Sequence, residues 1–189
     1  MSNFVAVLDA NVLYSYPLTS VLLELAELRL YRPIWSDDIQ DEWLRAAKRN
    51  HPKISPEKLD RRRAAMDEAL PDACIKGYRQ LIDVLKLPDP NDRHVLAAAI
   101  RANAEVIVTF NEKDFPEDAL EEYGLITQHP DTFLRHLIDL APDPVRVRIA
   151  EMVNALKNPP MTIESYISIL ERHSLPESAA ALRELFDLR

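Results

Sequence analysis

The feature that most constrains the fold is the alternation of short apolar runs with helical patterns. Residues 4–8 read Phe-Val-Ala-Val-Leu, and residues 105–110 read Glu-Val-Ile-Val-Thr-Phe. Continuous runs of this kind, rich in β-branched residues, are typical of strands buried on both faces, as in a parallel sheet. Because helical periodicities lie between such runs, the chain is expected to form an α/β sandwich around a mostly parallel sheet.

The other elements follow from the same periodicities and from helix-capping residues. Further strands are expected at residues 31–35, 83–87 and 125–127, and helices at residues 19–30 and 93–102. Ser36 is expected to cap a helix that runs to about residue 48. Ser55 is expected to cap the next helix, with Pro56 in its first turn.

The character of the sequence changes beyond about residue 139. Prolines punctuate three apolar stripes at helical spacing, and no strand pattern separates them. We therefore expect a main domain at residues 1–139 and a small helical extension at residues 140–189. Three short helices bury little apolar surface by themselves, so the extension is expected to dock on the main domain or on another subunit.

Composition excludes several classes of protein. The two glycines of the chain are too few for the phosphate-binding loops of ATPases or NAD enzymes. The lone Cys74 can form neither an intramolecular disulfide nor a cysteine-based zinc site. No apolar run approaches a membrane span, and the N-terminus lacks the pattern of a signal peptide. A cytoplasmic protein is expected.

Charge is unevenly distributed along the chain. The net charge of −8 argues against a protein that coats nucleic acid non-specifically. Residues 112–122 are strongly acidic, whereas residues 45–63 carry eight lysines and arginines against two acids. This basic segment is either a solvated helical face or a local grip on a polyanion. In the second case the candidate RNA-binding residues are Arg45, Lys48, Arg49, Arg61, Arg62 and Arg63.

Acids lie where ligands of an open α/β sheet gather, beyond the carboxyl ends of the strands. Asp9 ends the first strand, and Asp92 opens the helix at residues 93–102. Asp114 lies four residues beyond the strand at 105–110, and Glu42 is expected to reach in from the helix that begins at Ser36.

Clustered carboxylates repel one another unless a cation compensates their charge. Mg²⁺ or Mn²⁺ prefers carboxylate and water oxygens and leaves positions open for phosphate. This chemistry suits phosphodiester hydrolysis, in which a metal-bound water attacks in line. Asn11, Thr109 and Asn111 are candidates to orient the carboxylates by hydrogen bonds.

Each acid also has a structural alternative. Asp92 could simply cap its helix, Asp114 could cap the turn that follows it, and Glu42 could belong to a solvated helical face. Asp9 is harder to explain in this way, because an acid that ends a buried strand is costly without a partner. A phosphatase of the haloacid-dehalogenase type also places an aspartate there, but it usually has a second aspartate where this chain has Asn11.

Four ordered motifs resemble those of PIN domains. They are Leu-Asp-Ala-Asn-Val-Leu at residues 8–13, the acid of Asp-Glu-Trp at 41–43, Asp-Arg-His-Val-Leu-Ala-Ala-Ala-Ile at 92–100, and Thr-Phe-Asn-Glu-Lys-Asp-Phe at 109–115. The resemblance covers about residues 4–138. It implies a three-layer α/β/α sandwich and an Mg²⁺- or Mn²⁺-dependent nuclease.

The resemblance also implies a biological role and a ligand set. Many bacterial PIN domains are VapC-like toxins, often homodimers, that cleave RNA (frequently transfer RNA) and are silenced by a cognate antitoxin. A subfamily of these toxins carries a C-terminal helical extension. By this resemblance Asp9, Glu42, Asp92 and Asp114 are the catalytic and metal-binding acids, and Asp89 either joins them or shapes its turn. A degenerate PIN fold that only binds RNA or protein is the alternative.

Overall fold

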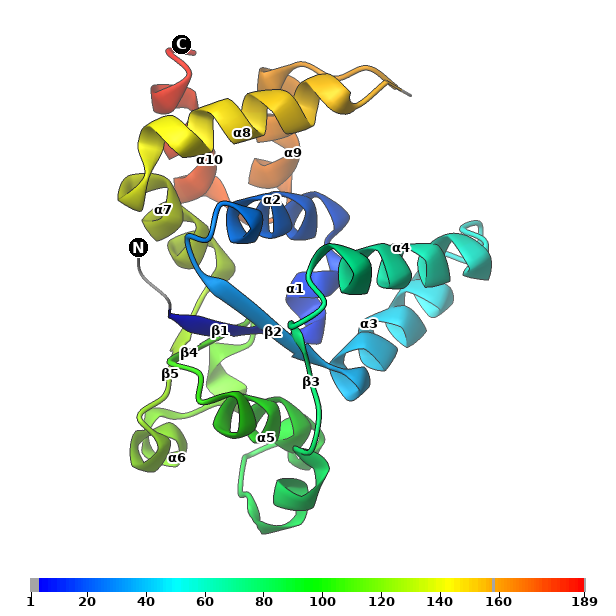
Figure 1. The fold of residues 1–189 in the computed structure, drawn as a ribbon, viewed down its shortest axis with the longest axis vertical. Helices are drawn as coiled ribbons and strands as arrows, with labels where there is room; N and C mark the ends of the chain where they lie inside the picture. Colours follow the sequence, from blue (N-terminus) through cyan, green and yellow to red (C-terminus); the bar gives the residue numbers. More distant parts are fainter. Residues whose placement is uncertain (1–3, 158, 189) are drawn as a thin grey trace. The chain divides into compact units, whose positions relative to one another are not determined.

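The computed structural model describes residues 4–157 and 159–188, and its centre is a parallel sheet. The strand order is β3-β2-β1-β4-β5, and all four neighbouring pairs are parallel (Figure 1). The parallel sheet expected from the apolar runs is confirmed. The strands are β1 (Val5–Leu8), β2 (Arg32–Ser36), β3 (Cys74–Ile75), β4 (Val106–Val108) and β5 (Ile126–Gln128).

One expected strand is wrong. Residues 83–87 do not join the sheet, and the 3₁₀ helix η1 (Arg79–Val84) occupies the start of that range. The apolar pattern there has another cause, because Leu85 and Leu87 are buried while Val84 is 73% exposed. The edge strand is β3 instead, which pairs Cys74 and Ile75 with the end of β2.

The chain forms two compact units. The sheet unit comprises residues 4–14 and 31–129, with the whole sheet. In it α5 covers one face of the sheet, and α1 lies on the other face with α3 packed against it (Figure 1). These layers give the expected α/β/α sandwich. The helices of this unit are α1 (Ala10–Tyr14), α3 (Asp37–Asn50), α4 (Pro56–Ala69), α5 (Arg93–Ala102) and α6 (Glu117–Leu120), with 3₁₀ turns η2 (Pro90–Asp92), η3 (Glu112–Asp114) and η4 (Glu121–Tyr123).

The helical unit comprises residues 15–30 and 130–188, apart from residue 158. Its helix from the N-terminal part of the chain is α2, which contacts α8 and α9. Tyr166 Oη donates a 2.6 Å hydrogen bond to the carbonyl of Pro17, and the buried Asp131 carboxylate accepts from the amide of Ser178 at 2.7 Å. The helices are α2 (Tyr16–Glu27), α7 (Pro130–Leu140), α8 (Pro142–Ala155), α9 (Ile163–Arg172) and α10 (Pro176–Leu185).

The composition of the helical unit bears on the domain boundary. It contains residues 15–30 and 130–139 in addition to the extension expected at 140–189. The boundary between residues 139 and 140 stays a prediction, and an experiment on it is given below. In the described part of the chain, no helix combines the length and the apolar character that a membrane span requires.

Candidate active site

Asp9 lies at the carboxyl end of β1, with its side chain only 5% exposed. Its backbone amide donates to the carbonyl of Val108, which holds the end of β1 against the end of β4. The amide of Ala10 donates to Oδ1 at 2.6 Å, and the side chains of Asn11 and Thr109 each donate to Oδ2 at 2.7 Å. The carboxylate is therefore fixed in direction by the start of α1 and by the residue that follows β4.

The turn after β4 is tied to the same carboxylate. Asn11 accepts a hydrogen bond from the amide of Phe110 at 3.2 Å, and its side-chain amide also donates to Thr109 Oγ1 at 3.0 Å. The amide of Asn111 donates to that same hydroxyl at 3.0 Å. Asn11 and Thr109 thus have the orienting contacts expected of them, while Asn111 contributes its backbone.

The acids act on one another electrostatically. Burial, together with the nearby Glu42, raises the pKa of Asp9 to about 6, although the Thr109 hydrogen bond opposes this. Burial also raises the pKa of Asp92 to about 7, and Asp9, Asp114, Asp89 and Glu42 add to the rise in that order. A carboxyl group that responds to four others in this way lies at the centre of an acidic cluster.

Hydrogen bonds bear on the structural alternatives for Asp92 and Asp89, whose roles in the site stay predictions. Asp92 lies at the start of α5, but its carboxylate caps no amide of that helix. The carboxylate of Asp89 does accept a hydrogen bond, from the amide of Asn91 at 2.8 Å, so it shapes the η2 turn. Asp114 ends the η3 turn.

Glu42 has a partner that the sequence did not reveal. Its carboxylate, 44% exposed, lies 3.1 Å from Nε2 of His94, whose side chain is 15% exposed. His94 is two residues after Asp92. The start of α5 therefore brings both Asp92 and the partner of Glu42 to the same site. The contact joins residues 52 positions apart, so no local pattern in the sequence signals it.

Comparison with known proteins identifies the family. Residues 5–113 match the PIN domain family. The chain belongs to the PIN-domain family. Residues 130–184 of this PIN protein match the family described as VapC50 C-terminal domain. The chain is 44% identical over 110 residues to a protein of Mycobacterium tuberculosis named "Putative ribonuclease VapC50". That match covers 58% of this chain and 64% of the relative. No solved structure matches the chain.

The acids of this PIN domain suit a hard divalent cation. No three acidic, histidine or cysteine side chains in the described ranges stand together in a geometry that would already hold a metal ion. The donor set is nonetheless all carboxylate, which is the set that Mg²⁺ and Mn²⁺ prefer. Burial, followed by the acidic neighbours, raises the pKa of Asp92 to about 7, and a cation would relieve the repulsion between these acids.

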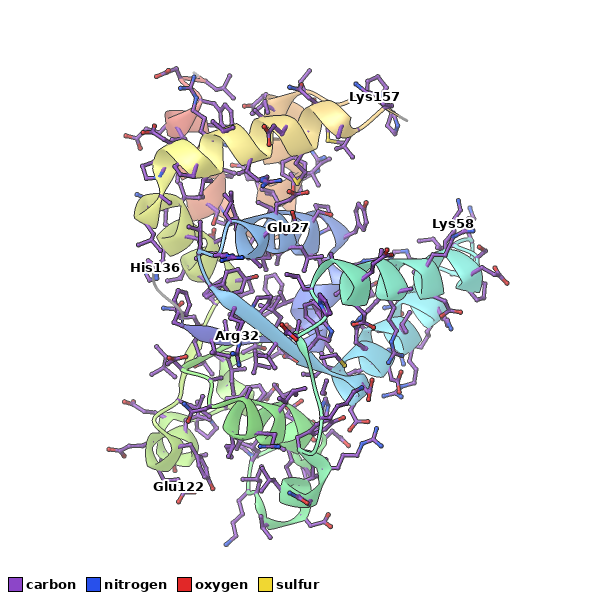
Figure 2. The ribbon with its side chains drawn as sticks, viewed as in Figure 1. Glu27, Arg32, Lys58, Glu122, His136 and Lys157 are labelled. Atoms are coloured by element: carbon purple, nitrogen blue, oxygen red, sulfur yellow. The ribbon has the colours of Figure 1, made fainter. Side chains whose placement is uncertain are left out.

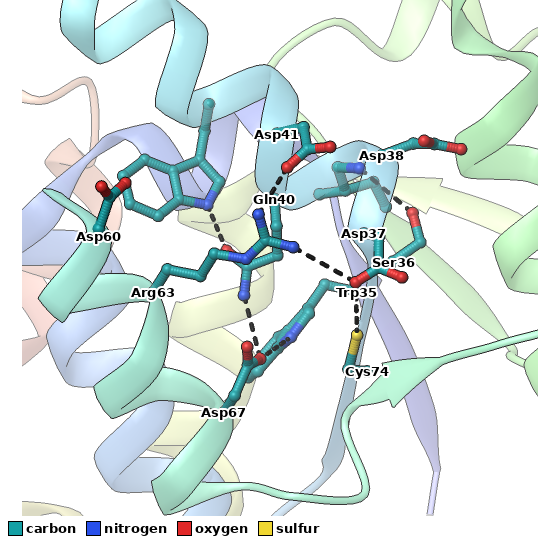
Figure 3. A network of polar contacts seen from close by, with 12 residues as sticks. Trp35, Ser36, Asp37, Asp38, Gln40, Asp41, Asp60, Arg63, Asp67 and Cys74 are labelled. Carbon is teal, nitrogen blue, oxygen red and sulfur yellow. Dashed lines mark hydrogen bonds and ion pairs between the residues drawn. The ribbon is translucent and has the colours of Figure 1, made fainter. Parts of the chain in front are cut away.

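The predicted RNA-binding residues of the PIN domain fall into two groups. Arg62 donates to the carbonyl of Leu13 and lies over the ring of Trp43, 4.5 Å from its centre. Arg63 forms ion pairs with Asp41 and Asp37 (Figure 3), and Lys48 pairs with Asp60 at 3.2 Å. These three side chains hold α4 to its neighbours. The other three, which make no such contacts and are exposed, are Arg45, Arg49 and Arg61.

Proposed function

We propose that this PIN domain is a divalent-metal-dependent endoribonuclease. The observation that carries the proposal is the buried Asp9 carboxylate at the adjoining carboxyl ends of β1 and β4, where burial and neighbouring acids raise its pKa and that of Asp92. Such a cluster is costly to fold unless it serves to bind cations. Phosphodiester hydrolysis is a reaction that needs positive charge at the attacking and leaving oxygens.

Each acid has a distinct place in the proposed site. Asp9, Glu42, Asp92 and Asp114 would hold Mg²⁺ or Mn²⁺, which when bound acidifies water and neutralises charge on the phosphate. Asn11 and Thr109 fix the direction of Asp9, since both donate to its Oδ2 atom. His94 fixes Glu42, whose more exposed side chain would otherwise sample several rotamers.

We also propose that the protein is the toxin of a toxin–antitoxin pair. The similarity to a protein named as a VapC ribonuclease supports this role, as does the match of residues 130–184 to the VapC50 C-terminal domain. RNA would be the substrate, with transfer RNA as the first class to test, and a cognate antitoxin protein would be the partner. We also propose that the protein acts in the cytoplasm, where RNA is translated. A homodimer is part of the proposal.

The test is RNA cleavage by the Asp9→Asn variant. The variant should lose Mg²⁺- or Mn²⁺-dependent cleavage while keeping the thermal unfolding of the wild type. Asp83→Asn is the matched control, because Asp83 is an exposed aspartate of the same unit outside the acidic cluster. Cleavage by Asp9→Asn at the wild-type rate would refute the assignment of the site.

A metal titration separates the nuclease from a degenerate PIN fold that only binds RNA or protein. Calorimetry with Mn²⁺ should show binding to the wild type and weaker binding to Asp92→Asn. No detectable heat with either protein, together with RNA binding that does not depend on the cation, would favour the binding module.

A further inference from the structure

Two arginines, Arg45 and Arg49, follow Glu42 on the same face of α3 and form a row along it. Arg45 and Arg49 follow Glu42 by three and seven residues, and this spacing puts all three side chains on one face of the helix. At about 1.5 Å of rise per residue, Arg49 lies roughly 10 Å along the helix axis from Glu42. Both arginines are exposed.

These two arginines differ from the other cations of the basic segment. The side of α3 that faces α4 carries Asp41 and Lys48, and both are paired with charges on α4. Among the described residues, neither Arg45 nor Arg49 has an ion-pair partner. An exposed pair of unneutralised arginines beside an acidic centre is not explained by folding, and it suits the phosphates of a polyanion.

An aromatic stack stands at the far end of the row. Tyr14 ends α1, and its ring stacks on that of His51, with centroids 5.8 Å apart and planes at 27°. Tyr14 Oη and His51 Nε2 are 2.9 Å apart, and the side-chain amide of Asn50 donates to Tyr14 Oη at 3.3 Å. The stack is thus held in place by hydrogen bonds, and His51 is exposed.

The packing of α1 along α3 relates the stack to the acids. α1 starts beside Asp9 and ends at Tyr14, while α3 carries Glu42 and is followed by His51 (Figure 1). The acidic cluster therefore lies at one end of this helix pair, and the aromatic stack lies at the other. Arg45 and Arg49 lie between the two ends.

We propose that this row is a subsite for single-stranded RNA, resting on the ribonuclease function proposed above. Arg45 and Arg49 bind phosphates of the strand that leaves the cleavage centre, and the Tyr14–His51 stack takes an unpaired base. Aromatic side chains and a cationic track together are the usual means of binding single strands. A base within a duplex cannot offer its face to a side chain, so the substrate is an RNA loop or end.

The stack is tested by RNA binding in the non-cleaving Asp9→Asn background with Mg²⁺ present. Fluorescence anisotropy with a short labelled oligoadenylate should show that His51→Leu and Tyr14→Leu each weaken binding by about 5- to 150-fold. Tyr123→Leu, in an exposed tyrosine of the same unit, should bind like the background protein. When the oligonucleotide carries an abasic residue in place of the base that stacks, the His51→Leu variant and the Asp9→Asn background protein should bind it with equal affinity.

The arginines are tested by the salt dependence of the same binding. Arg45→Gln and Arg49→Gln should each lower the slope of log affinity against log salt concentration by about one. The control is Arg32→Gln, because Arg32 is exposed at the start of β2 (Figure 2), at the edge of the sheet opposite the acids. If the slope of log affinity against log salt concentration is unchanged in both variants, Arg45 and Arg49 do not bind the phosphates and the proposed subsite is wrong.

The outcomes separate this inference from the proposed function. If the Asp9→Asn protein binds RNA and both stack variants bind it equally well, the subsite is wrong and the nuclease assignment stands. If the wild type cleaves RNA but the Asp9→Asn protein binds none with Mg²⁺ present, the subsite is wrong and the nuclease assignment stands; if the wild type neither binds nor cleaves RNA, both are wrong. Weaker binding by His51→Leu, with a normal Tyr123→Leu, supports the subsite even if Tyr14→Leu fails to fold.

Discussion

Asp92 carries an energetic cost in the metal-free protein. Burial and the surrounding acids raise its pKa from the ordinary 3.8 to about 7. Between these two values the unfolded chain has released the proton while the folded chain still holds it. Stability therefore falls as pH rises from about 4 to about 7, and the whole cost is present above that range. Asparagine at this position would remove the charge and with it the cost.

We predict that Asp92→Asn stabilises the metal-free protein at about pH 8 and has no such effect near pH 4. The gain should be on the order of 1 kcal/mol, because the carboxyl group is half-exposed and solvent screens its neighbours. Urea unfolding in the presence of a chelator measures it. With Mn²⁺ the wild type should recover the difference, since cation binding stabilises the folded state. A variant less stable than the wild type at pH 8 would contradict the prediction.

The sequence predicted the positions of these acids better than their surroundings. Asp9 and Asp114 could be located because apolar strands precede them, and parallel strands bring their carboxyl ends to one edge. His94 could not, because its contact with Glu42 joins two helices 52 residues apart and leaves no local pattern. Whether Asp92 caps its helix or belongs to the acidic cluster likewise depends on its hydrogen bonds, and these are set by the tertiary structure.

At the scale of elements, the basic helix α4 is attached through a side chain that looked like an RNA contact. Arg62 reaches from α4 to the carbonyl of Leu13 at the end of α1 and covers the buried Trp43 of α3. It therefore links three helices. Arg61, its neighbour in sequence, is exposed and makes none of these contacts.

We predict that Arg62→Met lowers the free energy of unfolding by about 1–3 kcal/mol, whereas Arg61→Met changes it by less than about 0.5 kcal/mol. The loss combines a charged hydrogen bond to a backbone carbonyl with a cation–π contact. Chemical denaturation of the two variants provides the comparison. Equal stability of both would show that Arg62 has no structural role.

Strands and helices were predictable where the pattern was long. The helix at 93–102 was expected with its observed bounds, whereas the strand at 83–87 is a 3₁₀ helix followed by extended chain. The true edge strand has only two residues, Cys74 and Ile75, and is held by pairing with β2. An element this short is specified by its partner and carries no periodicity of its own.

At the scale of the whole molecule, α2 belongs to the helical unit although it lies early in the chain. Its buried residues include Leu18, Val21, Leu22 and Leu25, and the helix contacts α8 and α9. A chain that ends at residue 139 would lack both of those helices. The apolar face of α2 would then meet water.

We predict that residues 1–139 alone aggregate or form large oligomers at concentrations where the full chain is soluble. Size-exclusion chromatography with light scattering compares the two chains. A soluble, monomeric fragment that unfolds cooperatively would instead establish the domain boundary expected from the sequence between residues 139 and 140.

The hydrogen bond from Thr109 to Asp9 joins residues 100 positions apart, and Asp114 lies further along still. During synthesis the ribosome releases the N-terminus first, so a nascent chain carries Asp9 long before it carries Thr109 or Asp114. A nascent chain that stops before Asp114 thus cannot assemble the proposed site, and on the proposed function such a truncated product would be harmless to the RNA of the cell that made it.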